Sequence, residues 1–274
     1  MRLLKSETKR KNIKGVIKLK LKHIDNGKSF DFGNTSKEYA KYRDIYPKEL
    51  YNKLYSLGIG LKDTNWLDMG TGTGVIPFNL CNFGASIKAI DISENQILAA
   101  KDLAKERNIK NIEFSVSGAE KTPFADNSFD CITAAQCFWY FDRENAINEI
   151  KRIIKPNGTF VKIYMSYMLA DELANESHKL VKKLNKNWTP GASGSKDIYN
   201  HPFENGVIET FECNIPFTRE SWHGRMLACR GTMASMDEDT LNKWNKKHLK
   251  LLEKYPQEFE IKHKVYIAYY KIEK

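Results

Sequence analysis

The chain has 274 residues, of which 41% are hydrophobic and 28% charged, and this composition allows an ordinary globular core. The sequence contains no apolar run near the roughly 18 residues that a membrane-spanning helix needs. Its five cysteines are scattered without a C-x-x-C pair, which is typical of reduced thiols and not of a disulfide or zinc framework, so no metal is expected. The N-terminus lacks the apolar core of a secretory signal, and we therefore expect a cytoplasmic protein without a membrane partner.

The formal net charge of +10 is concentrated at the start of the chain. Residues 1–28 contain ten Lys/Arg and two acids, a net charge of +8, which leaves about +2 for the remaining 246 residues. Such a run is usually a solvated extension, so we expect a basic N-terminal extension over 1–28 and a single domain over 29–274. Residues 16–23 alternate apolar and basic side chains, which leaves an edge strand or a contact arm open.

The first expected elements of the domain are two short helices. Thr35 or Ser36 is a suitable N-cap for the first helix. Tyr46-Pro47 interrupts it, because the residue before a proline disfavours helical backbone. A second helix is expected over about 47–57.

From residue 65 onward, apolar runs alternate with amphipathic segments. Strands separated by helices imply right-handed crossovers, and hence a parallel sheet covered on both faces. The expected strands are 65–70, 86–93, 112–118, 129–136 and 159–165, and the expected helices between them are 75–84, 94–107 and 143–158.

This alternation ends after residue 165. Residues 169–186 and 238–254 are expected to be helical, and 187–197 has the composition of a loop. Alternating patterns predict two further strands at 208–217 and 259–272.

Three alternating glycines, Gly70, Gly72 and Gly74, follow the first strand directly. In open α/β sheets, ligands bind beyond the carboxyl ends of the strands, and glycine there lets the backbone approach the ligand closely. The dinucleotide fingerprint G-x-G-x-x-G does not fit, because Val75 stands where its third glycine should be. A P-loop is excluded because no Gly-Lys-Ser/Thr follows.

Asp91 ends the second strand, 17 residues after Gly74. A carboxylate in that register is suited to accept hydrogen bonds from both hydroxyls of a ribose. A lone aspartate at a strand end is more often a cap or turn residue, and the glycine loop beside it favours the ligand interpretation. Segment 115–136 then adds two loops that flank the same crevice.

Five segments in order resemble the motifs of class I S-adenosylmethionine (SAM)-dependent methyltransferases, in particular the small-molecule branch that includes the ubiquinone/menaquinone-biosynthesis enzymes. The resemblance covers about residues 29–165. It implies a seven-stranded, Rossmann-like doubly wound α/β sheet whose last strand is antiparallel and inserted next to strand five. It also implies a helical substrate cover, with an insertion at about 166–205 and a cover segment at 218–254. The matching segments are LDMGTGTG (67–74), AIDIS (89–93), SGAEKTPFADNSFD (117–130), AAQCFWYFD (134–142) and RIIKPNGTF (152–160).

The same resemblance implies SAM as cofactor and places its binding residues. The glycines line the methionine part, Asp91 takes the ribose, and an N-terminal lid with Tyr39 and Arg43 reaches the SAM carboxylate. The full set implied is Tyr39, Arg43, Asp68, Gly70, Thr71, Gly72, Gly74, Asp91, Ile92, Gln96, Ala119, Glu120 and Gln136.

Catalysis and acceptor binding are less well marked in the sequence. Methyl transfer needs mainly proximity and orientation, and a general base only when the acceptor must lose a proton. Many relatives carry histidine where this chain has Trp139, which leaves His223 as a candidate base. Trp139, Trp222 and Arg225 are candidates for the acceptor pocket, Arg225 as an anion clamp. The acceptor atom and the oligomeric state are not determined by these residues.

Three other functions compete with methyl transfer to a small molecule. A nucleic-acid methyltransferase using the basic tail is disfavoured, because no Asp/Asn-Pro-Pro-aromatic loop follows strand four and Gln136, not proline, precedes Cys137. An NAD-dependent oxidoreductase is disfavoured by Val75 and by the Ala119-Glu120 segment. A protein that binds SAM without catalysis is left open. The expected partner is therefore a small-molecule methyl acceptor and not nucleic acid.

Overall fold

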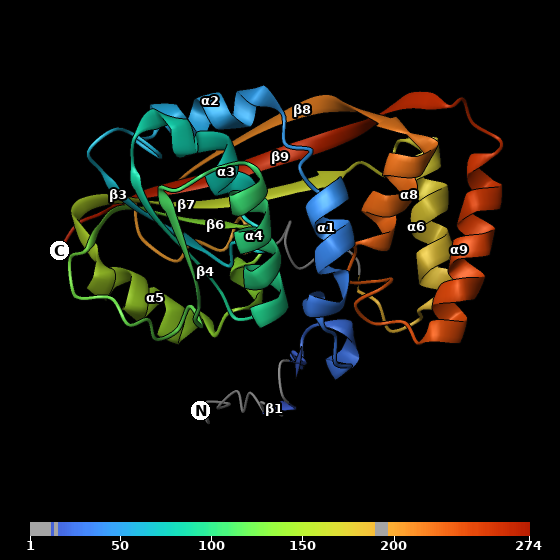
Figure 1. Ribbon diagram of the computed structural model, residues 1–274, viewed down its shortest axis with the longest axis horizontal. Helices are drawn as coiled ribbons and strands as arrows, with labels where there is room; N and C mark the ends of the chain where they lie inside the picture. The colour runs from blue at the N-terminus through green and yellow to red at the C-terminus, as the bar shows by residue number, and fades with distance from the viewer. Residues whose placement is uncertain (1–11, 14–15, 190–196) are drawn as a thin grey trace.

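The computed structural model describes residues 12–13, 16–189 and 197–274, and its centre is a seven-stranded mixed sheet (Figure 1). The strand order is β5-β4-β3-β6-β7-β9-β8. The first five of these strands are parallel, whereas β9 is antiparallel to both neighbours, β7 and β8. This confirms the predicted sheet with its last strand inserted beside strand five. The bounds are β3 (Asn65–Met69), β4 (Ser86–Asp91), β5 (Ile112–Val116), β6 (Phe129–Ala135), β7 (Ile154–Tyr167), β8 (Val207–Thr218) and β9 (Glu258–Ile272).

Helices cover both faces of this sheet, as crossover connections require. Alternate strand residues enter two separate apolar clusters: Trp66 packs with the residues of α2, α3 and α4, and Leu67 with those of α5. Figure 1 shows α2 and α5 on opposite sides of the strands. The bounds are α2 (Lys48–Ser56), α3 (Val75–Leu80), α4 (Glu94–Glu106) and α5 (Arg143–Ile153).

Side-chain caps fix where the two longer crossover helices begin. Asp142 Oδ1 accepts the N–H of Asn145 at the start of α5, and Ser93 is the N-cap of α4. Helix α5 ends at Ile153 and not at the expected residue 158. Strand β7 begins at the next residue, Ile154, which pairs with Phe129 of β6, and the register then shifts between Phe129 and Cys131. The long β7 is therefore continuous from the helix end into the cover.

A second group of helices packs beside the sheet, beyond the ends of β7, β8 and β9 (Figure 1). It consists of α6 (Glu172–Leu184), α8 (Arg219–Leu227) and α9 (Glu238–Leu252), close to the predicted helical ranges. Trp222 and Trp244 are fully buried at its centre. Helix α1 (Ser36–Tyr42) connects this group to the sheet: Gly224 of α8 leaves room for the Tyr42 ring, since a Cβ there would lie 2.2 Å from that ring. The predicted loop 187–197 lies largely outside the described residues.

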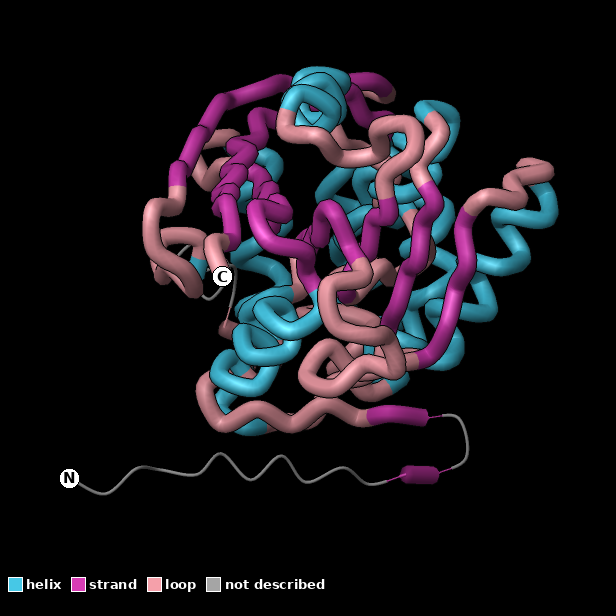
Figure 2. The backbone as a smooth tube through the Cα atoms, turned by 90° about the vertical axis from the view of Figure 1, so that its left-hand side faces the viewer, coloured by secondary structure: helices cyan, strands magenta, loops and turns pink. Residues whose placement is uncertain are grey.

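The segment before α1 is a packed arm where a solvated extension was expected. Leu19 and Phe30 exchange backbone hydrogen bonds of 2.9 and 3.0 Å, and Ile24 and Phe30 are buried in a small cluster with Ala234. Residues 19–28 keep their basic side chains exposed but pack on the domain through Ile24 and Asp25, which fits the contact arm that the pattern of 16–23 left open. Figure 2 shows this segment along one edge of the domain, after β1 (Asn12–Ile13) and β2 (Val16–Ile17). No helix in the described ranges is long and apolar enough to cross a bilayer.

Candidate active site

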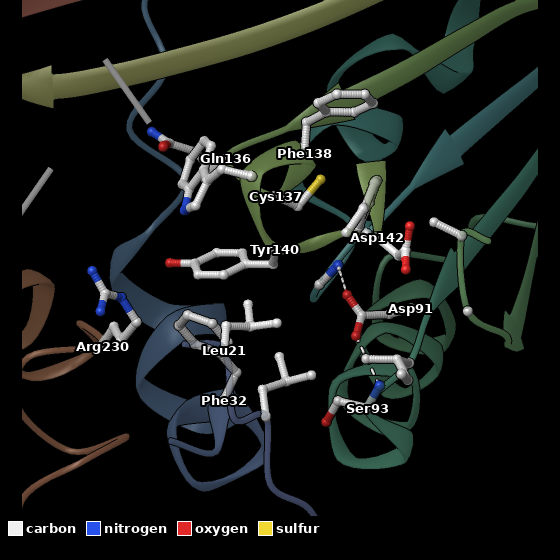
Figure 3. Close-up of a pocket in the computed structure, with 18 of the residues that line it drawn as sticks. Leu21, Phe32, Asp91, Ser93, Gln136, Cys137, Phe138, Tyr140, Asp142 and Arg230 are labelled. Carbon is white, nitrogen blue, oxygen red and sulfur yellow. Dashed lines mark hydrogen bonds between the residues drawn. The ribbon is translucent and has the colours of Figure 1, made fainter. Parts of the chain in front are cut away.

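A cavity of about 1070 Å³ lies where β3, β4 and β6 end, between these strand ends and the N-terminal arm (Figure 3). Parallel strands direct their carboxyl ends to one edge, which is where ligands bind in sheets of this kind. Ten of the 13 predicted cofactor residues line the cavity: Tyr39, Arg43, Gly70, Gly72, Asp91, Ile92, Gln96, Ala119, Glu120 and Gln136. The acceptor candidate Trp139 lines it as well.

Asp91 connects the two loops at one end of the cavity. Its Oδ2 accepts the N–H of Gly72 at 2.9 Å and its Oδ1 accepts the N–H of Ser93 at 2.8 Å (Figure 3). Burial raises the pKa of the Asp91 carboxyl, and these two N–H donors oppose that rise. A carboxylate has about four acceptor sites, so further sites remain for the hydroxyls of a ligand.

The three glycines of the loop have different surroundings. A Cβ at Gly72 would lie at least 3.8 Å from any neighbouring atom, so protein packing does not require glycine here. The backbone of Gly72 borders the cavity directly, where a side chain would take up space. A Cβ at Gly74 would lie 2.9 Å from the Phe78 ring, and Gly74 does not line the cavity. The prediction that all three glycines line the methionine part is therefore wrong for Gly74, which is glycine because of protein packing. All three have positive φ, between 57° and 85°.

Asp68 and Thr71 support the loop from beneath and do not line the cavity. Thr133 donates its hydroxyl to Asp68, and the Trp66 indole donates to Thr133 at 2.9 Å. Burial raises the pKa of Asp68 to about 7. The resemblance implies that Asp68 either supports the glycine loop or meets the amino group of SAM, and these contacts favour support of the loop.

The other end of the cavity is aromatic. Phe32 contacts Tyr140 with ring centroids 5.5 Å apart, and Trp139 lies beside Tyr140 at 5.1 Å. Figure 3 shows the Tyr140 hydroxyl directed towards Arg230, with Leu21 and Phe32 below the ring. Trp139 was a candidate for the acceptor pocket, and Arg230 belonged with Arg219 and Arg225 to a basic cluster that could hold a carboxylate. Leu21 and Phe32 were not predicted, because no motif links the arm to the strand ends.

Gln136 occupies a strained position between the two ends. Its φ is +60°, which is uncommon outside glycine and costs about 1–3 kcal/mol. Its backbone N–H donates to the Ile163 carbonyl at 2.9 Å, and its side-chain amide donates to the Met165 carbonyl. Strand β7 therefore holds this residue at the cavity wall.

A buried ion pair closes the arm over the cavity. Asp25 pairs with Arg230, and their side chains are 3% and 8% exposed. Thr189 joins both, because its N–H donates to Asp25 Oδ1 at 2.7 Å and its carbonyl accepts from Arg230 Nη2 at 2.7 Å. Asp25 and Asn26 both have positive φ, of 49° and 52°, so this turn is held against backbone strain.

Three of the four catalytic and acceptor candidates also lie outside the cavity lining. His223 stacks on Trp244, and its Nδ1 is 2.8 Å from Nδ1 of His248, so its candidacy as a general base is not supported. Trp222 is fully buried and its indole donates to Ser177 at 3.0 Å, which makes it a core residue and not a pocket wall. Arg225 is buried behind the cavity wall.

A seven-stranded sheet of this order, with a glycine loop and an acidic strand end on one cavity, has the architecture of the class I methyltransferases. Residues 67–162 match a family model described as a methyltransferase domain. The chain is 30% identical over 202 residues to a ubiquinone/menaquinone biosynthesis C-methyltransferase of Rickettsia felis, which covers 68% of this chain and 79% of that protein. It is 28% identical over 189 residues to a proposed methyltransferase of Dictyostelium discoideum, covering 65% and 68%.

Solved structures agree on the fold. A proposed type II methyltransferase from Anaeromyxobacter dehalogenans superposes with a TM-score of 0.61 at 20% identity, covering 84% of this chain and 97% of that chain. The chain belongs to the class I SAM-dependent methyltransferase family, and SAM is its methyl donor.

Proposed function

We propose that this methyltransferase acts on a small molecule with an aromatic or apolar body. The observation that carries this proposal is the continuous cavity of about 1070 Å³ with Asp91 and the glycine loop at one end and Phe32, Trp139 and Tyr140 at the other. Pockets for a single small ligand occupy roughly 300–1,000 Å³, so a cavity at the upper limit has room for a cofactor and an acceptor together. The relatives that are named for ubiquinone/menaquinone biosynthesis also support an acceptor that is a small molecule with an apolar body.

The residues at the strand ends fit SAM. Asp91 has acceptor capacity left for the ribose, and Gly72 exposes backbone where a side chain would occupy the cavity. Ile92, Ala119 and Glu120 line the part of the cavity assigned to the adenine. Tyr39 and Arg43 line it beside the glycine loop and are assigned to the methionyl carboxylate, with Gln96 near Gly72.

SAM supplies a methyl group on a sulfonium sulfur, which a nucleophilic atom of the acceptor takes by in-line displacement. The contribution of the protein is to hold the two molecules in contact, and such proximity can supply roughly 7–11 kcal/mol of the barrier. The aromatic wall would orient the acceptor, while the arm and the Asp25–Arg230 pair exclude water from the same space.

The proposal is tested by incubating the full chain with methyl-labelled SAM and, separately, a metabolite extract, total RNA and a protein extract. We expect label in a low-molecular-weight product and none in RNA or protein beyond the level of an Asp91→Ala control. Label recovered only in RNA would contradict the small-molecule assignment and support the alternative that uses the basic tail.

A further inference from the structure

Arg225 is a buried cation without an acidic partner among the described residues. Its side chain is 5% exposed, and no carboxylate in the described ranges pairs with it. The guanidinium faces the rings of Tyr167 and Trp222, with its carbon 4.8 and 5.5 Å from their centroids. Its Nε has no hydrogen-bond partner. A buried charge without a counter-charge destabilises the folded protein. We therefore expect an anionic ligand to pair with this guanidinium when it binds.

The uncompensated charge lies next to the cavity. Nη1 of Arg225 is 3.1 Å from Sγ of Cys229, and Cys229 lines the cavity together with Arg43. A thiol is a weak acceptor, so a stronger one entering from the cavity would displace it. Arg43 lines the same part of the cavity as Cys229, so a second cation lies near Arg225, and it lowers the pKa of Arg225 in addition to burial.

The methionyl carboxylate of SAM would pair with one of these two cations, Arg43. Arg43 follows Tyr39 by one helical turn, and Tyr39 is 3.8 Å from a Cβ built at Gly72, so Arg43 belongs to the glycine loop and the methionyl carboxylate. Arg225 comes from α8, on the other side of Cys229. Once that carboxylate is paired with Arg43, Arg225 still has no acidic partner among the described residues, and the sulfonium adds a further positive charge to the same cavity.

From this balance, and resting on the proposed function, we infer that the methyl acceptor is an anion whose carboxylate or phosphate group is held by Arg225 at the Cys229 wall, while its apolar body lies against Trp139 and Tyr140. Guanidinium groups bind both anions with paired N–H donors. Recognition by a buried guanidinium would also reject neutral analogues, because they leave its charge unpaired.

The test uses thermal melting of the full chain with benzoate, phenyl phosphate or neutral benzamide as probes, each with and without S-adenosylhomocysteine, the demethylated product of SAM. We expect benzoate or phenyl phosphate to raise the Tm and benzamide not to, and the stronger of the two anions identifies the preferred group. In Arg225→Met the anion response should be lost, while the affinity for S-adenosylhomocysteine measured by calorimetry stays within about twofold.

The matched control is Lys162→Met, which removes a buried cation that does have an acidic partner, Asp197 at 3.1 Å. Without ligand, Arg225→Met should melt at the wild-type Tm or above it, because it removes an unpaired charge, whereas Lys162→Met should melt several degrees lower. An Arg225→Met protein that melts well below wild type, or a wild type that does not distinguish the anions from benzamide, would overturn the inference. A large loss of S-adenosylhomocysteine binding in Arg225→Met would overturn it too, by assigning Arg225 to the cofactor. Failure of wild type to bind S-adenosylhomocysteine would instead contradict the proposed function.

Discussion

Asp91 holds the glycine loop and is available to a ligand through the same carboxylate. Asp91→Asn keeps an oxygen that can accept one backbone N–H but loses the negative charge. We expect the affinity for S-adenosylhomocysteine to fall by about 1.5–3 kcal/mol, the usual contribution of a charge-assisted hydrogen bond. Calorimetry of this variant beside Asp126→Asn, an exposed carboxylate, checks this, and equal affinities in the two proteins would show that the ribose is bound elsewhere.

Gly72 and Gly74 form a matched pair that separates ligand binding from packing. Both have positive φ, so alanine at either position is strained by about 1 kcal/mol or more. Gly74→Ala must also displace the Phe78 or Phe114 ring, and it should lower the Tm more than Gly72→Ala does. Gly72→Ala should instead lose affinity for SAM, because its methyl group enters the cavity. The reverse ranking in melting and calorimetry would mean that the loop is packed differently.

Two buried histidines predict loss of stability in acid. Burial lowers the pKa of His248 and of His263 to about 3, against about 6.5 in the unfolded chain. Above pH 6.5 both states are neutral and nothing changes. Below it the unfolded chain binds protons that the folded protein cannot, so the free energy of unfolding should fall by about 1.4 kcal/mol per pH unit for each histidine, down to about pH 3.

Urea unfolding of wild type and His248→Gln at pH 7.5, 6.0 and 5.0 measures this dependence. The variant should lose less stability between pH 6.0 and 5.0, since one of the two histidines with a pKa of about 3 is gone, although His223 and Ser177 lose their contacts with it at every pH. Parallel pH profiles for the two proteins would contradict the assignment.

The N-terminal arm contains a buried ion pair, Asp25–Arg230, in addition to its backbone and apolar contacts. Asp25→Asn leaves Arg230 buried without a counter-charge, a change that typically costs about 3–5 kcal/mol. We expect the arm to open and trypsin to cleave faster after Lys20 or Lys22. The double variant Asp25→Asn/Arg230→Met should regain most of the resistance, because no buried charge is left unpaired. Equal cleavage of the single and double variants would show that Thr189 and the apolar contacts hold the arm.

The parallel part of the sheet was predictable because its signals are local. The glycine loop follows its strand directly, Asp91 ends the next one, and Ser93 and Asp142 cap the helices that follow, so each element carries its own boundary. The alternating pattern of 16–23 allowed a contact arm and Trp139 was a candidate for the acceptor pocket, but the contacts that bring these segments together were not predictable. The Asp25–Arg230 pair and the Phe32–Tyr140 contact join segments far apart in the chain, and neither leaves a periodic pattern. The basic residues around Leu19 and Leu21 indicated a solvated segment. The segment packs on the domain because Ile24 and Phe30 are buried there.

The molecule as a whole places a cofactor end and an aromatic end on one cavity, and its parts come from three regions. The strand ends supply Asp91 and the glycine loop, the arm supplies Leu21 and Phe32, and the turn after α8 supplies Cys229 and Arg230. In the proposed assignment, cofactor binding depends on the sheet, whereas acceptor binding depends on how the arm and the helical cover meet.

Titration of the full wild-type chain with S-adenosylhomocysteine, followed by NADH under the same conditions, tests this account most directly. We predict one site for S-adenosylhomocysteine with a Kd in the micromolar range, which corresponds to about −8 kcal/mol, and no measurable heat from NADH. Tight binding of NADH with no binding of S-adenosylhomocysteine would contradict the assignment of Asp91 and the glycine loop to SAM.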